Sequence, residues 1–213
     1  MLMDSELIDK FIDYYWLTTG ASKNTLSAYQ SDLNIFNEWL EDKEITLVNS
    51  RHIQNYFKSR QKNGMSASTQ ARILTCLRLF YHYLLVNKVV NIDPTLKLNH
   101  PKQEKKLPVL LNIKEVEKIL DAPDLNSILG QRDRAMLELL YSCGLRVSEL
   151  INLSYHNINL KEEYIRIHGK GHKERVLPMG ELAIDYLSTY ENNARELLLK
   201  NGQCDSYFLS NRG

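Results

Sequence analysis

Cysteine is scarce in this sequence, and its scarcity excludes two classes of protein. The chain has 3 cysteines, Cys76, Cys143 and Cys204, which lie far apart and form no C-x-x-C pair. An odd, scattered set of this kind argues against a disulfide framework and against a zinc site. We therefore expect a protein of the reducing cytoplasm.

Long apolar runs are absent too. No run approaches the roughly 18 residues that a membrane helix needs, so we expect no membrane partner. The first ten residues carry Asp4, Glu6 and Asp9 in place of the basic and apolar regions of a signal peptide. Hydrophobic residues make up 43% of the chain and charged residues 25%, which is the composition of a soluble globular protein. A length of 213 residues suits one large domain or two ordinary ones.

A strong net charge is also missing, but the charges are unevenly distributed. The whole chain has a formal charge of +1. Residues 1–50 hold 3 Lys and Arg against 9 Asp and Glu, whereas residues 51–106 hold 11 Lys and Arg against 2 Asp and Glu. Concentrated positive charge is the usual signature of a surface that binds phosphate backbones. A basic face that only interacts with solvent is the alternative interpretation.

The first half of the chain, residues 1–98, predicts a bundle of four helices without strands. Apolar residues recur at helical spacing in four stretches, which are Leu7 to Tyr15, Leu26 to Leu40, Ile53 to Phe57 and Ile73 to Leu85. Ser22 and Asn24 are both candidates to cap the second helix. Arg72 and Arg78 lie outside the apolar stripe of the fourth helix and are left for other surfaces.

A domain boundary is expected at residues 99–108, which contain two prolines and three lysines and have little to bury. This stretch is an extended linker. The remaining residues, 109–213, predict both helices and strands. Helices are expected from Asn112 to Leu120, from Ser127 to the terminating Gly144, from Val147 to Leu153 and through Leu182 to Leu197, and strands over residues 164–168, 175–178 and 207–209. The fold class is therefore mainly α with a small β-hairpin.

Arg146 is the first candidate functional residue. It opens a short helix, where free backbone N–H groups and the helix dipole favour an anion. Its planar fork of donors suits two oxygens of one phosphate, and Glu149, one turn further, can hold that fork in one rotamer. An ordinary Arg-Glu pair on a helix surface is the alternative. We expect a buried setting for Arg146, because its neighbours are the apolar residues Leu145, Val147, Leu150 and Ile151. Such a setting favours the functional role.

Lys170 is the second candidate. It stands between Gly169 and Gly171 at the tip of the predicted hairpin, where glycine permits positive φ and the close approach of a ligand. A lysine in this position can supply a positive charge and a proton, although an ordinary exposed turn lysine has the same pattern. The spacing does not match G-x-x-x-x-G-K-[ST], and the loop joins two strands, so a nucleotide-binding phosphate loop is rejected.

Together these two motifs resemble a known family. Residues 140–150, LYSCGLRVSEL, followed later in the chain by residues 167–178, IHGKGHKERVLP, are similar to the tyrosine recombinase (phage integrase) family. Within it the resemblance is strongest to the bacterial Xer members of the XerD kind, and it covers essentially the whole chain. It implies a SAM-like core-binding domain for residues 1–98 and the first part of an α+β catalytic domain for residues 109–213.

The resemblance also implies a function. Members of this family are site-specific DNA recombinases in which a tyrosine attacks a DNA phosphodiester without a metal or cofactor, and the Xer type resolves chromosome or plasmid dimers at cell division. Arg146 would hold the non-bridging phosphate oxygens, Lys170 would protonate the departing 5′ oxygen, and Glu149 would support Arg146. The expected partners are double-stranded DNA and a second recombinase subunit. Further phosphate contacts are expected from Arg72, Arg78, Lys102, Lys105, Lys106, Lys173 and Arg175.

One part of the family pattern is missing from these residues. The pattern continues beyond the hairpin with a His-x-x-Arg motif and a nucleophilic tyrosine. Of the 6 histidines only His172 has an arginine three residues later, Arg175, and this pair belongs to the hairpin motif itself; we nominate none of the 12 tyrosines as nucleophile. We therefore expect that this chain stops before the nucleophile and does not cleave DNA alone. A non-catalytic DNA-binding module of the integrase type is the competing hypothesis. A helical protein-interaction domain with an incidental basic segment is a third.

Overall fold

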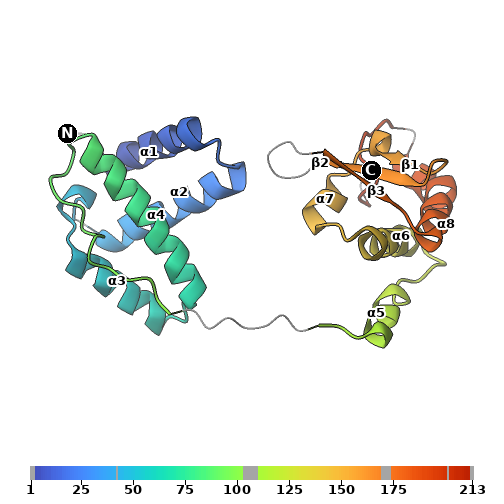
Figure 1. The fold of residues 1–213 in the computed structure, drawn as a ribbon, viewed down its shortest axis with the longest axis horizontal. Helices are drawn as coiled ribbons and strands as arrows, with labels where there is room; N and C mark the ends of the chain where they lie inside the picture. Colours follow the sequence, from blue (N-terminus) through green and yellow to red (C-terminus); the bar gives the residue numbers. More distant parts are fainter. Residues whose placement is uncertain (1–2, 42, 103–109, 169–173, 201, 212–213) are drawn as a thin grey trace. The chain divides into compact units, whose positions relative to one another are not determined.

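The computed structural model describes residues 3–41, 43–102, 110–168, 174–200 and 202–211. The chain divides into two compact units, residues 1–107 and 108–213, each described here by itself (Figure 1). Residues 103–108 of the predicted linker lie outside the described ranges, and so do the candidate residues Lys105, Lys106, Lys170 and Lys173. None of the helices in the described ranges is long and apolar enough to cross a membrane.

Four helices build the N-terminal unit, as the apolar spacing predicts. They are α1 (Asp4–Thr19), α2 (Lys23–Leu40), α3 (Ser50–Lys62) and α4 (Ala67–Val86), with a short 3-10 helix (Ile45–Leu47) before α3. The Ser22 hydroxyl accepts a hydrogen bond from the backbone N–H of Thr25 at 3.3 Å. Ser22, and not Asn24, is therefore the cap of α2. The described part of this unit contains no strand.

Aromatic side chains fill the centre of this bundle. Phe36 of α2 and Tyr56 of α3 are both 0% exposed, and their ring centroids lie 5.0 Å apart. Phe11 of α1 packs edge-on against Phe80 of α4, with centroids 5.4 Å apart. Burial of each such ring contributes roughly 1.5–3 kcal/mol. These contacts hold the four helices together, and α4 lies across α2 (Figure 1).

The C-terminal unit combines helices with a small sheet. Its helices are α5 (Ile113–Leu120), α6 (Ile128–Cys143), α7 (Val147–Ile151), α8 (Glu181–Thr189) and α9 (Glu196–Leu199), and a π-helical turn (Tyr190–Arg195) joins the last two. The strands are β1 (Ile158–Asn159), β2 (Tyr164–His168) and β3 (Glu174–Pro178), paired antiparallel in the order β1-β2-β3. The predicted hairpin is confirmed as β2 and β3. Strand β1 was not predicted.

The alternating pattern of β2 explains why the hairpin lies on the helices. Ile165 and Ile167 are 0% and 2% exposed, while Arg166 between them faces solvent. Side chains alternate faces along a strand, so the two isoleucines share one face. They join the core formed with Leu139 of α6 and Leu187 of α8. In the register of the hairpin, Ile167 is paired with Arg175 of β3.

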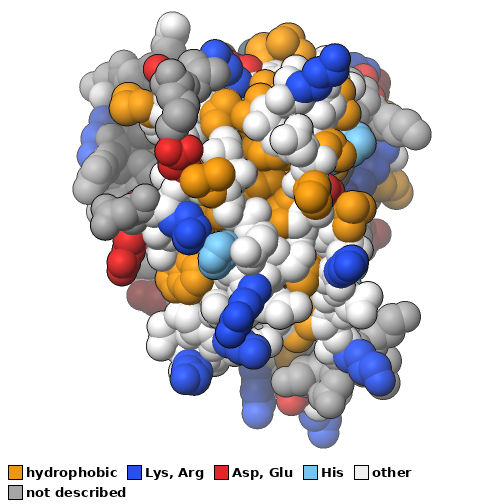
Figure 2. All heavy atoms as spheres, turned by 90° about the vertical axis from the view of Figure 1, so that its left-hand side faces the viewer, with side chains coloured by type: hydrophobic (Ala, Val, Ile, Leu, Met, Phe, Trp, Pro, Cys, Tyr) orange, Lys and Arg blue, Asp and Glu red, His pale blue; other side chains and the backbone are white. Residues whose placement is uncertain are grey.

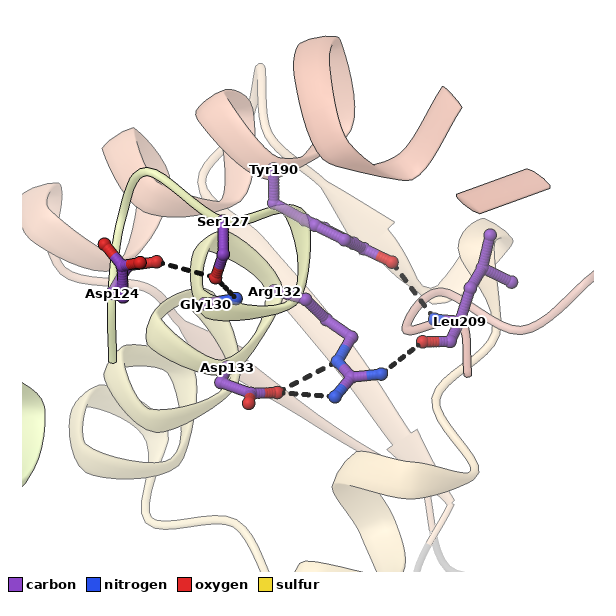
Figure 3. Close-up of polar contacts among 7 residues, drawn as sticks. All are labelled: Asp124, Ser127, Gly130, Arg132, Asp133, Tyr190 and Leu209. Atoms are coloured by element: carbon purple, nitrogen blue, oxygen red, sulfur yellow. Dashed lines mark hydrogen bonds and ion pairs between the residues drawn. The ribbon is translucent and has the colours of Figure 1, made fainter. Parts of the chain in front are cut away.

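Gly130 allows a tight entry into α6. The Ser127 hydroxyl accepts from the Gly130 backbone N–H at 3.0 Å and donates to the Asp124 backbone carbonyl at 2.9 Å (Figure 3). A Cβ atom at position 130 would lie 1.9 Å from that carbonyl oxygen, which is shorter than any real contact. Only glycine fits this position without a shift of the loop.

The predicted strand at residues 207–209 is wrong. Ser206 forms an isolated bridge to Ser154, in which the Tyr207 N–H donates to the Leu153 carbonyl at 2.8 Å, and the Leu209 backbone that follows is held by side chains. The Tyr190 hydroxyl accepts from the Leu209 N–H at 3.0 Å, and Arg132 donates to the Leu209 carbonyl at 2.8 Å (Figure 3). Tyr207 and Leu209 are buried and anchor this irregular segment. Because they are two residues apart, their spacing is the same as that of buried residues in a strand.

Candidate phosphate-binding site

Arg146 lies between the end of α6 and the first residue of α7. Gly144 ends α6 in the left-handed conformation with φ 59°, and Arg146 then occupies the N-cap position of α7 in extended conformation. A glycine adopts this left-handed φ at little cost, so the chain can turn sharply there. The turn leads directly into α7, and the Arg146 side chain contacts Glu149 one helical turn further on.

The predicted burial around Arg146 is wrong for the outer face of α7. Leu145 and Leu150 are 9% and 2% exposed and attach the helix to the core. Val147 and Ile151, however, are 67% and 56% exposed, and the Arg146 side chain is 68% exposed. An amphipathic helix and a fully buried one share the same short apolar run. The guanidinium of Arg146 is therefore available at the surface.

Glu149 fixes the orientation of Arg146. One of its carboxylate oxygens accepts from the Arg146 backbone N–H at 2.8 Å, and the other accepts from Nη1 of the same residue at 2.8 Å. The Glu149 side chain is only 6% exposed. The contact expected from the three-residue spacing is present, and it combines a capping interaction with an ion pair.

Arg175 of β3 binds the same carboxylate. Its Nη2 donates to Oε2 of Glu149 at 2.9 Å, and its side chain is 39% exposed. One carboxylate thus brings together two guanidiniums that are 29 residues apart in sequence, and we call Arg146, Glu149 and Arg175 the Glu149 cluster. The sequence named Arg175 only as a phosphate contact and did not indicate this pairing.

The electrostatics of the Glu149 cluster favour an anion. The backbone N–H of Arg146 lowers the pKa of Glu149 most, and the two guanidiniums lower it further against the opposing effect of burial. The carboxylate is therefore ionised at neutral pH, and two positive charges around one negative charge leave a net charge of +1. Each guanidinium carries five N–H donors, of which the cluster uses few. This charge matches one phosphodiester, and the unused donors can bind its oxygens.

The remaining candidate residues are only partly placed by the structure. Lys170 and Lys173 lie outside the described residues, as do Lys105 and Lys106, and Lys102 is exposed. In the N-terminal unit, Arg78 donates to the Leu98 carbonyl and contacts the His100 ring. Arg72 forms an ion pair with the buried Asp32. Among the described residues, no group of three or more His, Cys, Asp or Glu is arranged to hold a metal ion.

Comparisons with known proteins identify similar sequences along nearly the whole chain. The phage integrase family matches residues 110–213, and the N-terminal SAM-like domain of phage integrases matches residues 8–88. Tyrosine recombinase XerD of Pseudomonas putida is 45% identical over 213 residues, which cover 99% of this chain and 72% of that protein. XerD of Staphylococcus aureus is 39% identical over 210 residues, which cover 97% of this chain and 71% of that protein.

Solved structures of integrases share the fold. A lambda integrase dimer bound to a COC′ core site has a TM-score of 0.72 at 16% identity, covering 97% of this chain and 70% of that one. The Tn1549 transposon integrase in complex with circular intermediate DNA has a TM-score of 0.66 at 16% identity, covering 100% of this chain and 73% of that one. The predicted combination of a SAM-like helical unit with a mixed α and β unit is therefore confirmed.

Proposed function

This chain belongs to the phage integrase family of tyrosine recombinases, and from this membership we propose that it binds double-stranded DNA and acts in site-specific recombination. The observation that carries the proposal is the Glu149 cluster. It presents an exposed guanidinium with a net positive charge at the position where the family resemblance expects a phosphate ligand. A surface of this kind suits the backbone of DNA.

The cluster can stabilise negative charge on a phosphate. Arg146 donates two parallel hydrogen bonds to the non-bridging oxygens, and Arg175 adds a second cation beside it. Because Glu149 already fixes both guanidiniums, little reorganisation is needed when charge develops on these oxygens. Fixed donors of this type stabilise a transition state more than a ground state. The role of Arg146 is therefore to bind and polarise the phosphodiester.

Lys170 is assigned to the departing oxygen. In the sequence it falls between β2 and β3, and β3 carries Arg175 of the Glu149 cluster. An ammonium there donates a proton to the 5′ oxygen as the bond to phosphorus breaks, which is general acid catalysis. The proposed partners are DNA and a second recombinase subunit, and the proposed location is the cytoplasm. Within the 213 residues we assign no nucleophile.

The proposal is tested by neutralising single phosphates. A tight-binding duplex is first selected from a random library with the 213-residue chain, and each phosphate near its centre is then replaced by an uncharged methylphosphonate. Affinity should fall about tenfold to a hundredfold at one phosphate, because charged hydrogen bonds contribute roughly 1.5–3 kcal/mol. Arg146→Met should bind the unmodified duplex as weakly as the parent binds the modified one, and should be insensitive to that replacement.

A matched control is Lys10→Ala, which removes one exposed positive charge from α1. This variant should keep the phosphate sensitivity of the parent. The assignment of Arg146 is wrong if every methylphosphonate replacement weakens the binding of Arg146→Met equally. It is also wrong if the variant binds the unmodified duplex as tightly as the parent does. If the parent binds no duplex, the DNA function itself is wrong.

A further inference from the structure

The N-terminal unit contains a second ion pair between an arginine and a carboxylate, and the charge of a further arginine acts on it. Asp32 of α2 is 5% exposed and forms an ion pair with Nη1 of Arg72 on α4. The positive charge of Arg60 on α3 also acts on the Asp32 carboxyl and lowers its pKa. The ion pair joins α2 to α4, and Arg60 of α3 adds positive charge to it; we call Asp32, Arg60 and Arg72 the Asp32 cluster.

The cluster has more positive charge and more donors than Asp32 needs. Two guanidiniums around one carboxylate leave a net charge of +1. The Arg72 side chain is 44% exposed although its partner is buried, so its guanidinium reaches solvent. Nε of Arg60 is buried and has no hydrogen-bond partner among the described residues. Buried donors are nearly always satisfied in folded proteins, so an unsatisfied one needs an explanation.

A purely structural role does not explain this arrangement. Burial of a carboxylate is costly, and apolar residues of similar volume usually stabilise a fold as well as a buried ion pair does. Burial remains the largest influence on Asp32 and raises its pKa despite both arginines. The excess charge and the exposed guanidinium indicate a ligand that is an anion.

The surrounding sequence matches a polyanion. Residues 51–92 contain 7 Lys and Arg and no Asp or Glu. The carboxylate that pairs with Arg72 therefore comes from outside this segment, from α2. Figure 2 shows one face of the N-terminal unit, on which Lys and Arg side chains spread over the lower half with few acidic ones among them. A face of this composition attracts the phosphates of DNA over several residues.

We propose that Asp32 is a positioning residue that holds Arg72 to bind one backbone phosphate of DNA. The inference rests on the proposed DNA-binding function and adds a phosphate contact that is independent of the Glu149 cluster. Arg72 binds the phosphate, Asp32 orients the Arg72 guanidinium, and Arg60 adds positive charge nearby. The N-terminal unit then fixes one phosphate through an arginine that a buried carboxylate orients.

Asp32→Asn gives the sharpest test, because simple charge arithmetic and the proposal predict opposite results. The variant removes a negative charge, so long-range electrostatics alone predict tighter DNA binding. The proposal predicts binding that is about threefold to tenfold weaker, because Arg72 loses its orientation. Affinity is measured by fluorescence anisotropy on the selected duplex between 50 and 200 mM salt, and circular dichroism melts verify that each variant is folded.

A second variant, Arg72→Lys, keeps the charge next to Asp32 but loses the planar fork. Arg72→Lys should also bind DNA several-fold more weakly than the parent. The double variant, Asp32→Asn with Arg72→Lys, should bind no more weakly than the weaker-binding single variant. In the methylphosphonate series, both variants should become insensitive to one phosphate that differs from the phosphate of Arg146. A merely structural role would not change the response at one particular phosphate.

The outcomes separate this inference from the function on which it rests. If the parent binds no DNA, the proposed function fails. If the parent binds DNA, and Asp32→Asn binds as tightly or more tightly, the positioning role is overturned while the DNA function stands. The same holds if Arg72→Lys keeps the parent's affinity and its full set of sensitive phosphates. Lys10→Ala is again the control and should match the parent.

Discussion

In each unit the positive charges of two arginines act on one buried carboxylate, but the two carboxylates differ in their electrostatics. In the C-terminal unit the pKa of Glu149 is lowered, chiefly because the Arg146 backbone N–H donates to it. In the N-terminal unit the pKa of Asp32 is raised, because burial outweighs the attraction of Arg72 and Arg60. The same three charges therefore produce opposite shifts, and the environment of the carboxylate decides the sign.

The difference lies in the number of hydrogen bonds that each carboxylate accepts. Glu149 accepts from one backbone N–H and from two guanidiniums, and its neighbour Arg146 is exposed to solvent. Asp32 lies between helices, and Arg72 is the guanidinium that donates to it. Glu149 is thus stabilised as an anion whether or not DNA is bound. Asp32 depends on one arginine to remain charged, so the stability of its unit depends on that pair.

The largest effect is expected when Arg72 is replaced by methionine, which leaves Asp32 buried without its partner. Breaking a buried pair costs about 3–5 kcal/mol, and the partial exposure of Arg72 reduces the expected loss to about 2–3 kcal/mol. Both tryptophans, Trp16 and Trp39, lie in the N-terminal unit, so tryptophan fluorescence in a urea titration reports on this unit.

The control for that loss is the double variant Asp32→Asn with Arg72→Met. It has no buried carboxylate to leave unpaired, so it should recover most of the stability lost by Arg72→Met alone. A double variant as unstable as Arg72→Met would show that the arginine stabilises the unit by packing and not by pairing with Asp32.

A smaller effect, with a defined pH dependence, is expected for Glu149→Gln. Because the pKa of Glu149 is lowered in the folded protein, its stabilising contribution is complete above the ordinary glutamate range and is lost as the pH falls through the folded value. The variant should be about 1–2 kcal/mol less stable than the parent at pH 7. The difference should shrink below about pH 4.3, the unperturbed value of a glutamate.

Hydrogen exchange of the amides in α7 measures this difference in stability within the C-terminal unit. Asp32→Asn gives the opposite sign, since the raised pKa of Asp32 means that its charged form opposes folding. The comparison of the two clusters is wrong if the penalty of Glu149→Gln stays constant as the pH falls from 7 to 3.

The local half of each cluster was predictable from sequence, and the long-range half was not. Arg146 and Glu149 are three residues apart on one helix turn, so their contact follows from helical geometry. Arg175 reaches Glu149 only because β3 folds back beside α7, and Asp32 meets Arg72 across two helices that are 40 residues apart in sequence. No periodicity in the chain encodes such a pairing.

The elements themselves follow the sequence where one period dominates. The helices of the N-terminal unit and the β2–β3 hairpin show clear spacing and agree with prediction. Short apolar runs are ambiguous, because a strand, an irregular buried segment and an amphipathic turn all contain them. For this reason the pattern at Tyr207 and Leu209 predicted a strand where the segment is irregular. In the same way, the exposed Val147 and Ile151 were predicted to be buried.

The smallest effect on stability is expected for Arg146→Met. The Arg146 side chain is 68% exposed, and Glu149 keeps its bond to Arg175 when Arg146 is replaced. Exposed ion pairs contribute about 0–1 kcal/mol, so the loss should stay within about 1 kcal/mol in a thermal or urea titration followed by circular dichroism. The same variant should lose its sensitivity to one DNA phosphate. If Arg146 hardly affects stability but determines phosphate binding, its role is to bind the ligand. A stability loss above about 2 kcal/mol would show instead that Arg146 stabilises the fold.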